Sequence, residues 1–308
     1  MDARLVIRMS FFILPVLAAG CCTTKPKPAQ TKDIRNQAAE PVTNLRNGLD
    51  FESAASFHNQ CAGIFENYVD DKGKVDYKML RRNRPELKAV LKQFGSLSPK
   101  EYKSWSKEDK IAFWINAYNL NKLDIAAENY PITPTPQFSA LNYWGPNSIR
   151  HIEGQITRHK FSVMSEEFTF AEIERRFFRT GFDDPMIFFA ITGACVSSPP
   201  LRNEPYFGYK LDGQLEDQTK KFISNPLAFR IDRESRKVYL SALFQMSSYG
   251  EEFVNKYATD EKFKDRSPVT RAVLNFICNY ISKQDVSFLE VGNYTVSFMS
   301  YDWTINNR

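Results

Sequence analysis

An uninterrupted apolar run, Met186 to Thr192, ends in a short polar turn that two prolines close. The run has the length of a strand that is buried on both faces. The residues after it offer two hydroxyls, a thiol and a guanidinium within a few positions. The pattern therefore predicts a buried strand over 186–192 and a candidate site in the segment from Pro185 to Tyr206.

A second apolar pattern, between Ser106 and Tyr130, predicts a helix whose apolar positions surround it almost completely. Ser106 is a suitable N-cap for this helix. Three asparagines interrupt the apolar positions, and helical spacing places Asn116 and Asn119 on one face. A buried amide needs partners for both its oxygen and its nitrogen. We therefore expect these side chains either to hold neighbouring loops against the core or to line a site.

Other helices and strands follow from local signals. Helical patterns with recognisable starts or breaks occur at 52–67, at 77–94 with Pro85 as a possible break, after the capping box of Thr169 and Glu172, at 211–224, and after Ser267-Pro268. Alternating patterns predict hairpins over 150–164 and 229–240 and a last strand over 294–299. The sequence thus predicts an α+β fold over residues 50–308, a helix-rich single domain with a small, mostly antiparallel sheet.

The first 21 residues have the pattern of a signal peptide. Arg4 and Arg8 precede a short apolar stretch, and LAAGC ends it at Cys21. This run resembles a bacterial lipobox, which implies an acylated Cys21 and a lipid anchor on the periplasmic or outer-membrane face; the alternative is plain secretion. Residues 22–49 are polar and contain prolines, which favours a disordered tether.

Composition and charge exclude several classes of protein. The chain of 308 residues is 43% hydrophobic, long enough to bury a large core, and its net charge of +5 is the small difference between 41 basic and 36 acidic residues. The basic residues are interspersed with acids, so we expect no nucleic-acid partner. The spacing of Cys61, Cys195 and Cys278 fits no zinc site. With phosphate-loop and dinucleotide motifs also absent from the sequence, we expect no metal and no cofactor.

Most of the candidate catalytic and binding residues lie in or near the turn that follows the apolar run. A nucleophilic mechanism would use Cys195 or Ser198, and it needs a base within hydrogen-bond reach. Glu174 is either a carboxylate that supports this turn or a member of a surface ion pair. A binding site would instead use neutral donors and one guanidinium to hold an anionic or amide-bearing ligand; its candidate residues are Asn116, Asn119, Ser197, Arg202 and Tyr206.

Several motifs in a fixed order carry a family resemblance: YVDDKGKVDY, AFWINAYN, IERRFFR, SSPPLRNEPY, FISNP and YDWTIN. With these motifs the chain resembles the domain of unknown function 547 family. The resemblance implies an α+β domain that is frequent in secreted or membrane-attached bacterial proteins, and it implies no established activity.

The sequence departs from the family pattern at the positions that would carry thiol chemistry. Ser198 stands where relatives have a cysteine before the proline, and Gly193 stands where they have an earlier one. Arg175 replaces a histidine that many relatives carry in the short helix. Two hypotheses remain: an envelope protein that binds a small-molecule or peptide ligand near residues 193–206, and a thiol- or serine-dependent hydrolase or acyl-transfer enzyme, in an intact or a degenerate form.

Overall fold

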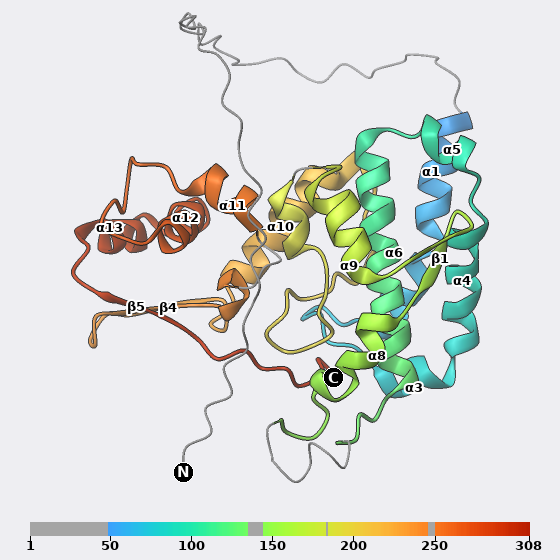
Figure 1. Ribbon diagram of the computed structural model, residues 1–308, viewed down its shortest axis with the longest axis horizontal. Helices are drawn as coiled ribbons and strands as arrows, with labels where there is room; N and C mark the ends of the chain where they lie inside the picture. Colours follow the sequence, from blue (N-terminus) through green and yellow to red (C-terminus); the bar gives the residue numbers. More distant parts are fainter. Residues whose placement is uncertain (1–48, 135–143, 183, 246–249) are drawn as a thin grey trace, which may run out of the picture. The chain divides into compact units, whose positions relative to one another are not determined.

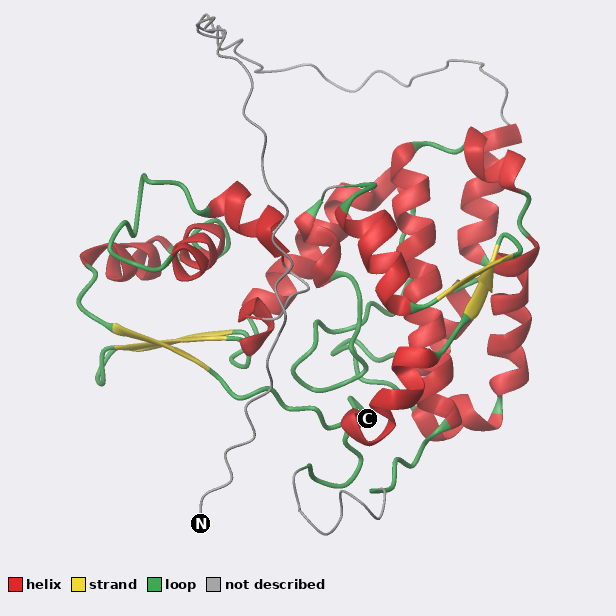
Figure 2. Cartoon of the chain, viewed as in Figure 1, coloured by secondary structure: helices red, strands yellow, loops and turns green. Residues whose placement is uncertain are grey.

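The computed structural model describes residues 49–134, 144–182, 184–245 and 250–308. Helices dominate this part of the chain and strands form only two small sheets (Figures 1 and 2), which confirms the predicted helix-rich α+β fold. Within the same described ranges, none of the helices combines the length and the apolar character needed to span a bilayer. The predicted signal peptide and most of the predicted tether lie outside the described residues.

The helices are α1 (Leu49–Asn59), α2 (Ala62–Tyr68), α3 (Tyr77–Arg82), α4 (Arg84–Ser96), α5 (Pro99–Ser104), α6 (Lys107–Glu128), α8 (Glu153–Arg158), α9 (Phe170–Ile173), α10 (Leu211–Ile223), α11 (Gly250–Tyr257), α12 (Pro268–Ile277) and α13 (Lys283–Val291). Shorter helical segments are η1 (Ile149–Ile152), η2 (Glu174–Arg179), η3 (Pro185–Phe189), η4 (Gly208–Lys210) and η5 (Ala242–Gln245). The strands are β1 (Phe161–Val163), β2 (Glu166–Phe168), β3 (Phe229–Asp232), β4 (Lys237–Leu240) and β5 (Thr295–Phe298).

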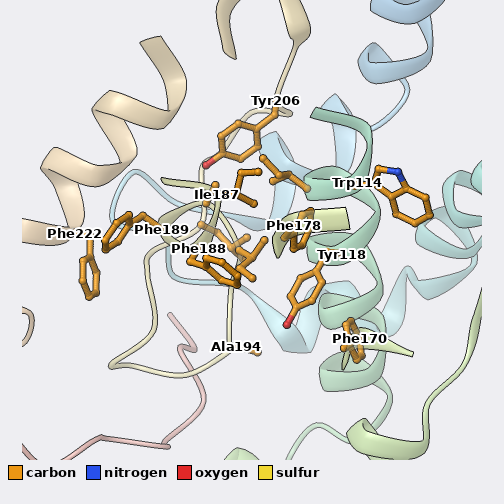
Figure 3. Close-up of a cluster of buried hydrophobic side chains, with 14 of the residues drawn as sticks. Trp114, Tyr118, Phe170, Phe178, Ile187, Phe188, Phe189, Ala194, Tyr206 and Phe222 are labelled. Atoms are coloured by element: carbon orange, nitrogen blue, oxygen red, sulfur yellow. The ribbon is translucent and has the colours of Figure 1, made fainter. Parts of the chain in front are cut away.

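Helix α6 is the centre of the helical layer, as its pattern predicts. The Ser106 side chain accepts a hydrogen bond from the Asp109 backbone N–H at 3.0 Å and caps its start. Almost every residue from Ile111 to Ala127 is buried, because α1, α3, α4, α9 and α10 all contact this helix. Figure 3 shows Phe188 and Phe189 between α6, which carries Tyr118, and α10, which carries Phe222.

The predicted strand over 186–192 is wrong, because residues Pro185–Phe189 form the 3-10 helix η3. The Asp184 side chain accepts a hydrogen bond from the Met186 N–H at 2.9 Å, and Pro185 occupies the first turn. A cap followed by proline is a helix start signal. A short apolar run cannot by itself separate a buried strand from a buried helical turn, and here the local start signal decides.

The predicted hairpin over 150–164 is also wrong in its position. Residues Ile149–Ile152 and Glu153–Arg158 are helical, and the Ser148 side chain accepts a hydrogen bond from the Arg150 N–H at the start of η1. The hairpin lies further along the chain, where β1 pairs with β2 in antiparallel register, Phe161 opposite Phe168. Met164 and Ser165 have positive φ angles of 51° and 63° and make the turn.

The remaining elements follow the predicted pattern with local changes. The predicted first helix is divided into α1 and α2 near Cys61, and α3 and α4 are divided beside Pro85. The capping box of Thr169 and Glu172 is formed. The β3–β4 hairpin is formed in antiparallel register, and β5 adds to β4 in parallel, which makes the second sheet mixed.

The last residues of the chain connect distant segments. Thr304 pairs with Ser148, Ile305 pairs with Cys195, and Asn307 pairs with Val75. The Asn306 side chain accepts a hydrogen bond from the Tyr77 hydroxyl at 2.8 Å. This C-terminal segment therefore forms one side of the turn that the sequence identified as the candidate site.

Candidate functional site

A pocket of about 200 Å³ lies beside the turn between Gly193 and Ser198. Its walls come from α6, η2, η3, η5, the turn itself and the C-terminal segment. The lining side chains are mostly aromatic or aliphatic, with one carboxylate: Tyr118, Glu174, Phe188, Ile191, Thr192, Gly193, Ser198, Pro199, Leu243, Tyr301 and Trp303. Two of the predicted catalytic residues, Glu174 and Ser198, line this pocket.

Cys195 lies behind the pocket wall and its exposed fraction is 1%. Its Sγ lies 3.6 Å from the Tyr301 hydroxyl, which lies at the pocket. Burial raises the pKa of the Cys195 thiol. Because the thiolate is the nucleophilic form, this environment disfavours nucleophilic chemistry at Cys195.

The two serines of the turn make hydrogen bonds to backbone groups. The Ser198 hydroxyl donates to the Cys195 carbonyl oxygen at 2.7 Å, and the Ser197 hydroxyl accepts from the Asp302 N–H at 2.9 Å. The Ser197 N–H in turn donates to the Asp302 carbonyl oxygen at 3.2 Å. These bonds close the turn and attach the C-terminal segment to it, as serine side chains do in tight turns.

Glu174 is the charged group of the pocket. Its Oε1 accepts a hydrogen bond from the Tyr118 hydroxyl at 2.7 Å. In the described ranges, Glu174 forms no ion pair, and its Oε2 accepts no hydrogen bond. One carboxylate oxygen of a half-buried residue at the pocket wall is thus left for a bound molecule.

Lys122 lies near this carboxylate, one helical turn beyond Tyr118. Its ammonium lies 3.7 Å from the centre of the Phe170 ring and 5.2 Å from the centre of the Tyr118 ring. Burial lowers the pKa of Lys122 to about 8, although the charges of Glu174 and Cys195 act in the opposite direction. Lys122 and Glu174 thus form a pair of opposite charges beside the pocket.

Asn116 and Asn119 hold loops and do not line the pocket. The Asn116 side chain donates to the Tyr206 carbonyl oxygen and accepts from the Tyr206 N–H, both at 2.9 Å. The Asn119 side chain donates to the Ala190 carbonyl oxygen and accepts from the Thr192 N–H, also at 2.9 Å. Each amide therefore satisfies one backbone donor and one backbone acceptor of a loop packed on α6.

Arg202 belongs to an ion-pair cluster with Glu204, Asp217 and Lys210. Its guanidinium donates to Glu204 Oε1 at 2.7 Å and to Asp217, and Lys210 donates to Glu204 Oε2 at 2.7 Å. Burial alone would raise the pKa of Glu204, but hydrogen bonds from Lys210, Arg202 and Gln214 lower it to about 2. The guanidinium is thus already neutralised by carboxylates, and neither Arg202 nor Tyr206 lines the pocket.

This cluster gives a testable pH dependence. Because the folded-state pKa of Glu204 lies below its ordinary value of 4.5, its contribution to stability is present above pH 4.5 and is lost as pH falls toward about 2. In Glu204→Gln, urea unfolding should show a smaller fall in the free energy of unfolding between pH 5 and pH 3. Glu216→Gln, at an exposed helical ion pair, should retain the wild-type fall; equal slopes in all three proteins would contradict this assignment.

The three histidines of the sequence, each of which could supply an imidazole base, do not line this pocket. His58 is fully buried and its Nδ1 lies 3.3 Å from the Asn116 amide nitrogen, while His151 Nε2 lies 3.1 Å from the Gly145 carbonyl oxygen. His159 stacks on Phe170. The pocket lining contains no histidine among the residues that the structure describes.

Sequence reasoning missed the aromatic residues that form most of the pocket. Tyr118 belongs to the AFWINAYN motif, and Tyr301 and Trp303 flank Asp302 in the YDWTIN motif. Both motifs can be recognised in the sequence, but only the folded structure shows that their aromatic side chains line the same pocket. In the described ranges, no group of three or more His, Cys, Asp and Glu side chains is arranged to hold a metal ion.

Comparisons with known proteins find a match for the central part of the chain only. No curated protein and no solved structure matches the sequence. The YVDDKGKVDY and YDWTIN segments, which also carry the resemblance, lie outside the stretch that a family model matches. Residues 102–223, which include α6, Glu174 and the turn from Gly193 to Ser198, match the family described as Protein of unknown function, DUF547.

Proposed function

We propose that this chain is a membrane-anchored cell-envelope protein that binds a small ligand in the pocket lined by Tyr118, Glu174, Tyr301 and Trp303. The ligand carries a hydrogen-bond donor, an amine or an amide, on a largely apolar body. This proposal is based on the Glu174 carboxylate. One of its oxygens accepts no hydrogen bond from the described residues, and most of the other side chains that line the pocket are aromatic or aliphatic. A concave apolar site with few polar groups is the usual form of a small-molecule site.

The chemistry of the pocket favours a donor-bearing ligand over an anionic one. A carboxylate repels an anion and accepts hydrogen bonds from N–H groups. The guanidinium of Arg202, which an anionic ligand would need, is engaged by Glu204 and Asp217. Of the two ligand classes that the sequence left open, the amide-bearing one is therefore the better supported.

The binding proposal is also better supported than hydrolysis. Cys195 and Ser198 are 1% and 4% exposed, and the Ser198 hydroxyl donates to a backbone carbonyl within its own turn. A general base must lie within hydrogen-bond reach of the nucleophile. The side-chain groups that contact the Cys195 thiol include the Tyr301 and Ser198 hydroxyls, and a neutral hydroxyl is a weak base near neutral pH.

Small-molecule binding can be tested by ligand-observed NMR with a library of small amides and amines. Fragments that bind the wild-type chain should lose about tenfold or more in affinity in Glu174→Gln, because a hydrogen bond to a charged acceptor contributes about 1.5–3 kcal/mol. Glu216→Gln, an exposed carboxylate on α10, should leave affinity unchanged. Equal binding to wild type and Glu174→Gln would contradict the proposed site.

The proposal of a membrane anchor is based on the lipobox-like run that ends at Cys21, and it can be tested separately. Chain purified from bacterial membranes should show the mass of an acylated mature form that begins at Cys21. Cys21→Ser should leave the membrane fraction and lose the acyl mass. A native mass equal to the unmodified mature chain would support secretion instead.

A further inference from the structure

A second cleft, of about 510 Å³, lies between α4 and the β1–β2 hairpin and shares no lining residue with the pocket at Glu174. Figure 1 shows α4 beside β1. The lining of the cleft combines three lysines with three hydroxyls, one amide, one carboxylate and one imidazole: Lys88, Leu91, Lys92, Gly95, Ser96, Asn121, Asp124, His159, Lys160, Phe161, Ser162 and Ser165. We call this cleft the lysine groove.

The hairpin turn fixes the shape of the lysine groove. The Met164 and Ser165 N–H groups donate to the Phe94 and Gly95 carbonyl oxygens at 2.8 and 2.9 Å, which satisfies carbonyls at the end of α4. Ser162 passes close to Gly95, where an added Cβ would lie 3.2 Å from the Ser162 hydroxyl. Both walls are therefore anchored to each other at one end.

The charges of the groove do not cancel. Asp124 is fully buried and is paired with Arg84 at 2.8 Å and with Lys88 at 2.7 Å, while Arg84 also pairs with Glu128. These two cations and two carboxylates balance. Lys92 has no carboxylate within 4.0 Å among the described residues, and Lys160 has only Glu167 at 3.8 Å, where both side chains are exposed. Lys92 on one wall thus carries an uncompensated positive charge, and Lys160 on the other wall is only weakly compensated through a long, exposed contact.

Hydrogen-bond donors accompany these charges. In the described part of the chain the Ser162 hydroxyl has no hydrogen-bond partner. The Ser96 and Ser165 hydroxyls make only long bonds to the Gln93 and Gly95 carbonyl oxygens, at 3.3 and 3.4 Å. These hydroxyls can turn toward an acceptor in the groove.

We propose that the lysine groove binds a phosphate-bearing molecule, with Lys92 and Lys160 holding the phosphate from opposite walls and the serine hydroxyls donating to its oxygens. A phosphate monoester carries between one and two negative charges near neutral pH and several acceptor oxygens, which matches two ammonium groups better than a single carboxylate does. Anionic phosphate oxygens are offered by a soluble phosphate compound and also, with one charge per phosphodiester, by the headgroup of an anionic phospholipid such as phosphatidylglycerol.

The test uses the full chain and its variants Lys92→Gln and Lys160→Gln. The control is Lys237→Gln, an exposed lysine of β4 outside the groove. One arm titrates inorganic pyrophosphate by calorimetry; the other measures sedimentation with vesicles of phosphatidylglycerol and phosphatidylcholine, compared with phosphatidylcholine alone. Each groove variant should weaken binding about three- to fivefold, as expected for a partly exposed charge pair, and added salt should weaken it further.

Pyrophosphate binding that depends on Lys92 and Lys160 supports a soluble phosphate ligand, and lysine-dependent binding to anionic vesicles alone supports a lipid headgroup. Any contribution of the N-terminal residues to vesicle binding is common to all variants. The proposal is overturned if neither probe binds, or if Lys237→Gln weakens binding as much as the groove variants do.

Discussion

Asn119→Ala is expected to lower the free energy of unfolding by about 3–5 kcal/mol. The substitution leaves the Thr192 N–H and the Ala190 carbonyl without their side-chain partner, in a buried segment beside α6. Each unsatisfied buried group costs about 1–3 kcal/mol, and the lost side-chain volume adds to this cost. Urea unfolding at pH 7 measures the change directly.

A matched asparagine on the same helix provides the control. Asn129 caps the end of α6, and its side chain donates to a single carbonyl, that of Ile125, at 2.8 Å. Asn129→Ala should therefore cost only about 1 kcal/mol. A similar small cost for both variants would show that Asn119 does not hold the loop, and would favour a role for its amide in ligand binding.

Acid should destabilise the fold through His58, by up to about 3 kcal/mol between pH 6.5 and pH 4. Burial lowers the pKa of His58 to about 4, below its ordinary 6.5. Between these values the unfolded chain takes up a proton that the folded chain does not, so the free energy of unfolding falls by about 1.4 kcal/mol per pH unit. The contribution is fully present above pH 6.5 and is lost as pH falls through this window.

The structure explains why His58 stays neutral. Its Nδ1 lies beside the Asn116 amide nitrogen, which makes Nδ1 the acceptor and places the ring proton on Nε2. Nε2 lies 3.9 Å from Asp109 Oδ1, too far for a hydrogen bond. Urea unfolding of His58→Gln at several pH values should show a flatter profile from pH 6.5 to 4. His159→Gln provides the comparison: burial lowers the pKa of His159 as well, but this side chain is only partly buried, so its variant should flatten the profile less than His58→Gln does. If His58→Gln and wild type have parallel profiles, the assignment to His58 is wrong.

The parts of the fold that could be predicted are those with local signals. Ser106, Thr169 and Ser267 each cap a helix where the sequence predicts one, because a cap acts within a few residues of itself. The β3–β4 hairpin also depends on a short connection. The parallel partner of β4 could not be predicted, because β5 lies more than 50 residues further along the chain.

The error at η3 has a local cause that the sequence contained. Asp184 followed by Pro185 is a helix start, but the apolar run after it has the length of a strand. Periodicity cannot decide between the two when every position is buried. The start signal should be given more weight than the apolar run in such segments.

The sequence indicated where the candidate pocket lies better than it indicated which residues line the pocket. The turn at Cys195 and Ser198 does lie beside a pocket, and Glu174 lines that pocket with Ser198. Its aromatic walls come from Tyr118 and from Tyr301 and Trp303, which lie about 180 residues apart in sequence. Such a convergence depends on tertiary packing and has no signature in a single sequence.

We propose that the turn from Gly193 to Ser198 is a wall of a binding pocket and does not carry out nucleophilic catalysis. The most direct test is intact-mass analysis of the folded chain after treatment with thiol-directed and serine-directed reactive probes, with Cys195→Ala and Ser198→Ala in parallel. We expect no adduct at Cys195 or Ser198 in the folded protein, and alkylation of Cys195 only after denaturation. Rapid stoichiometric labelling of the folded chain that either substitution abolishes would contradict it.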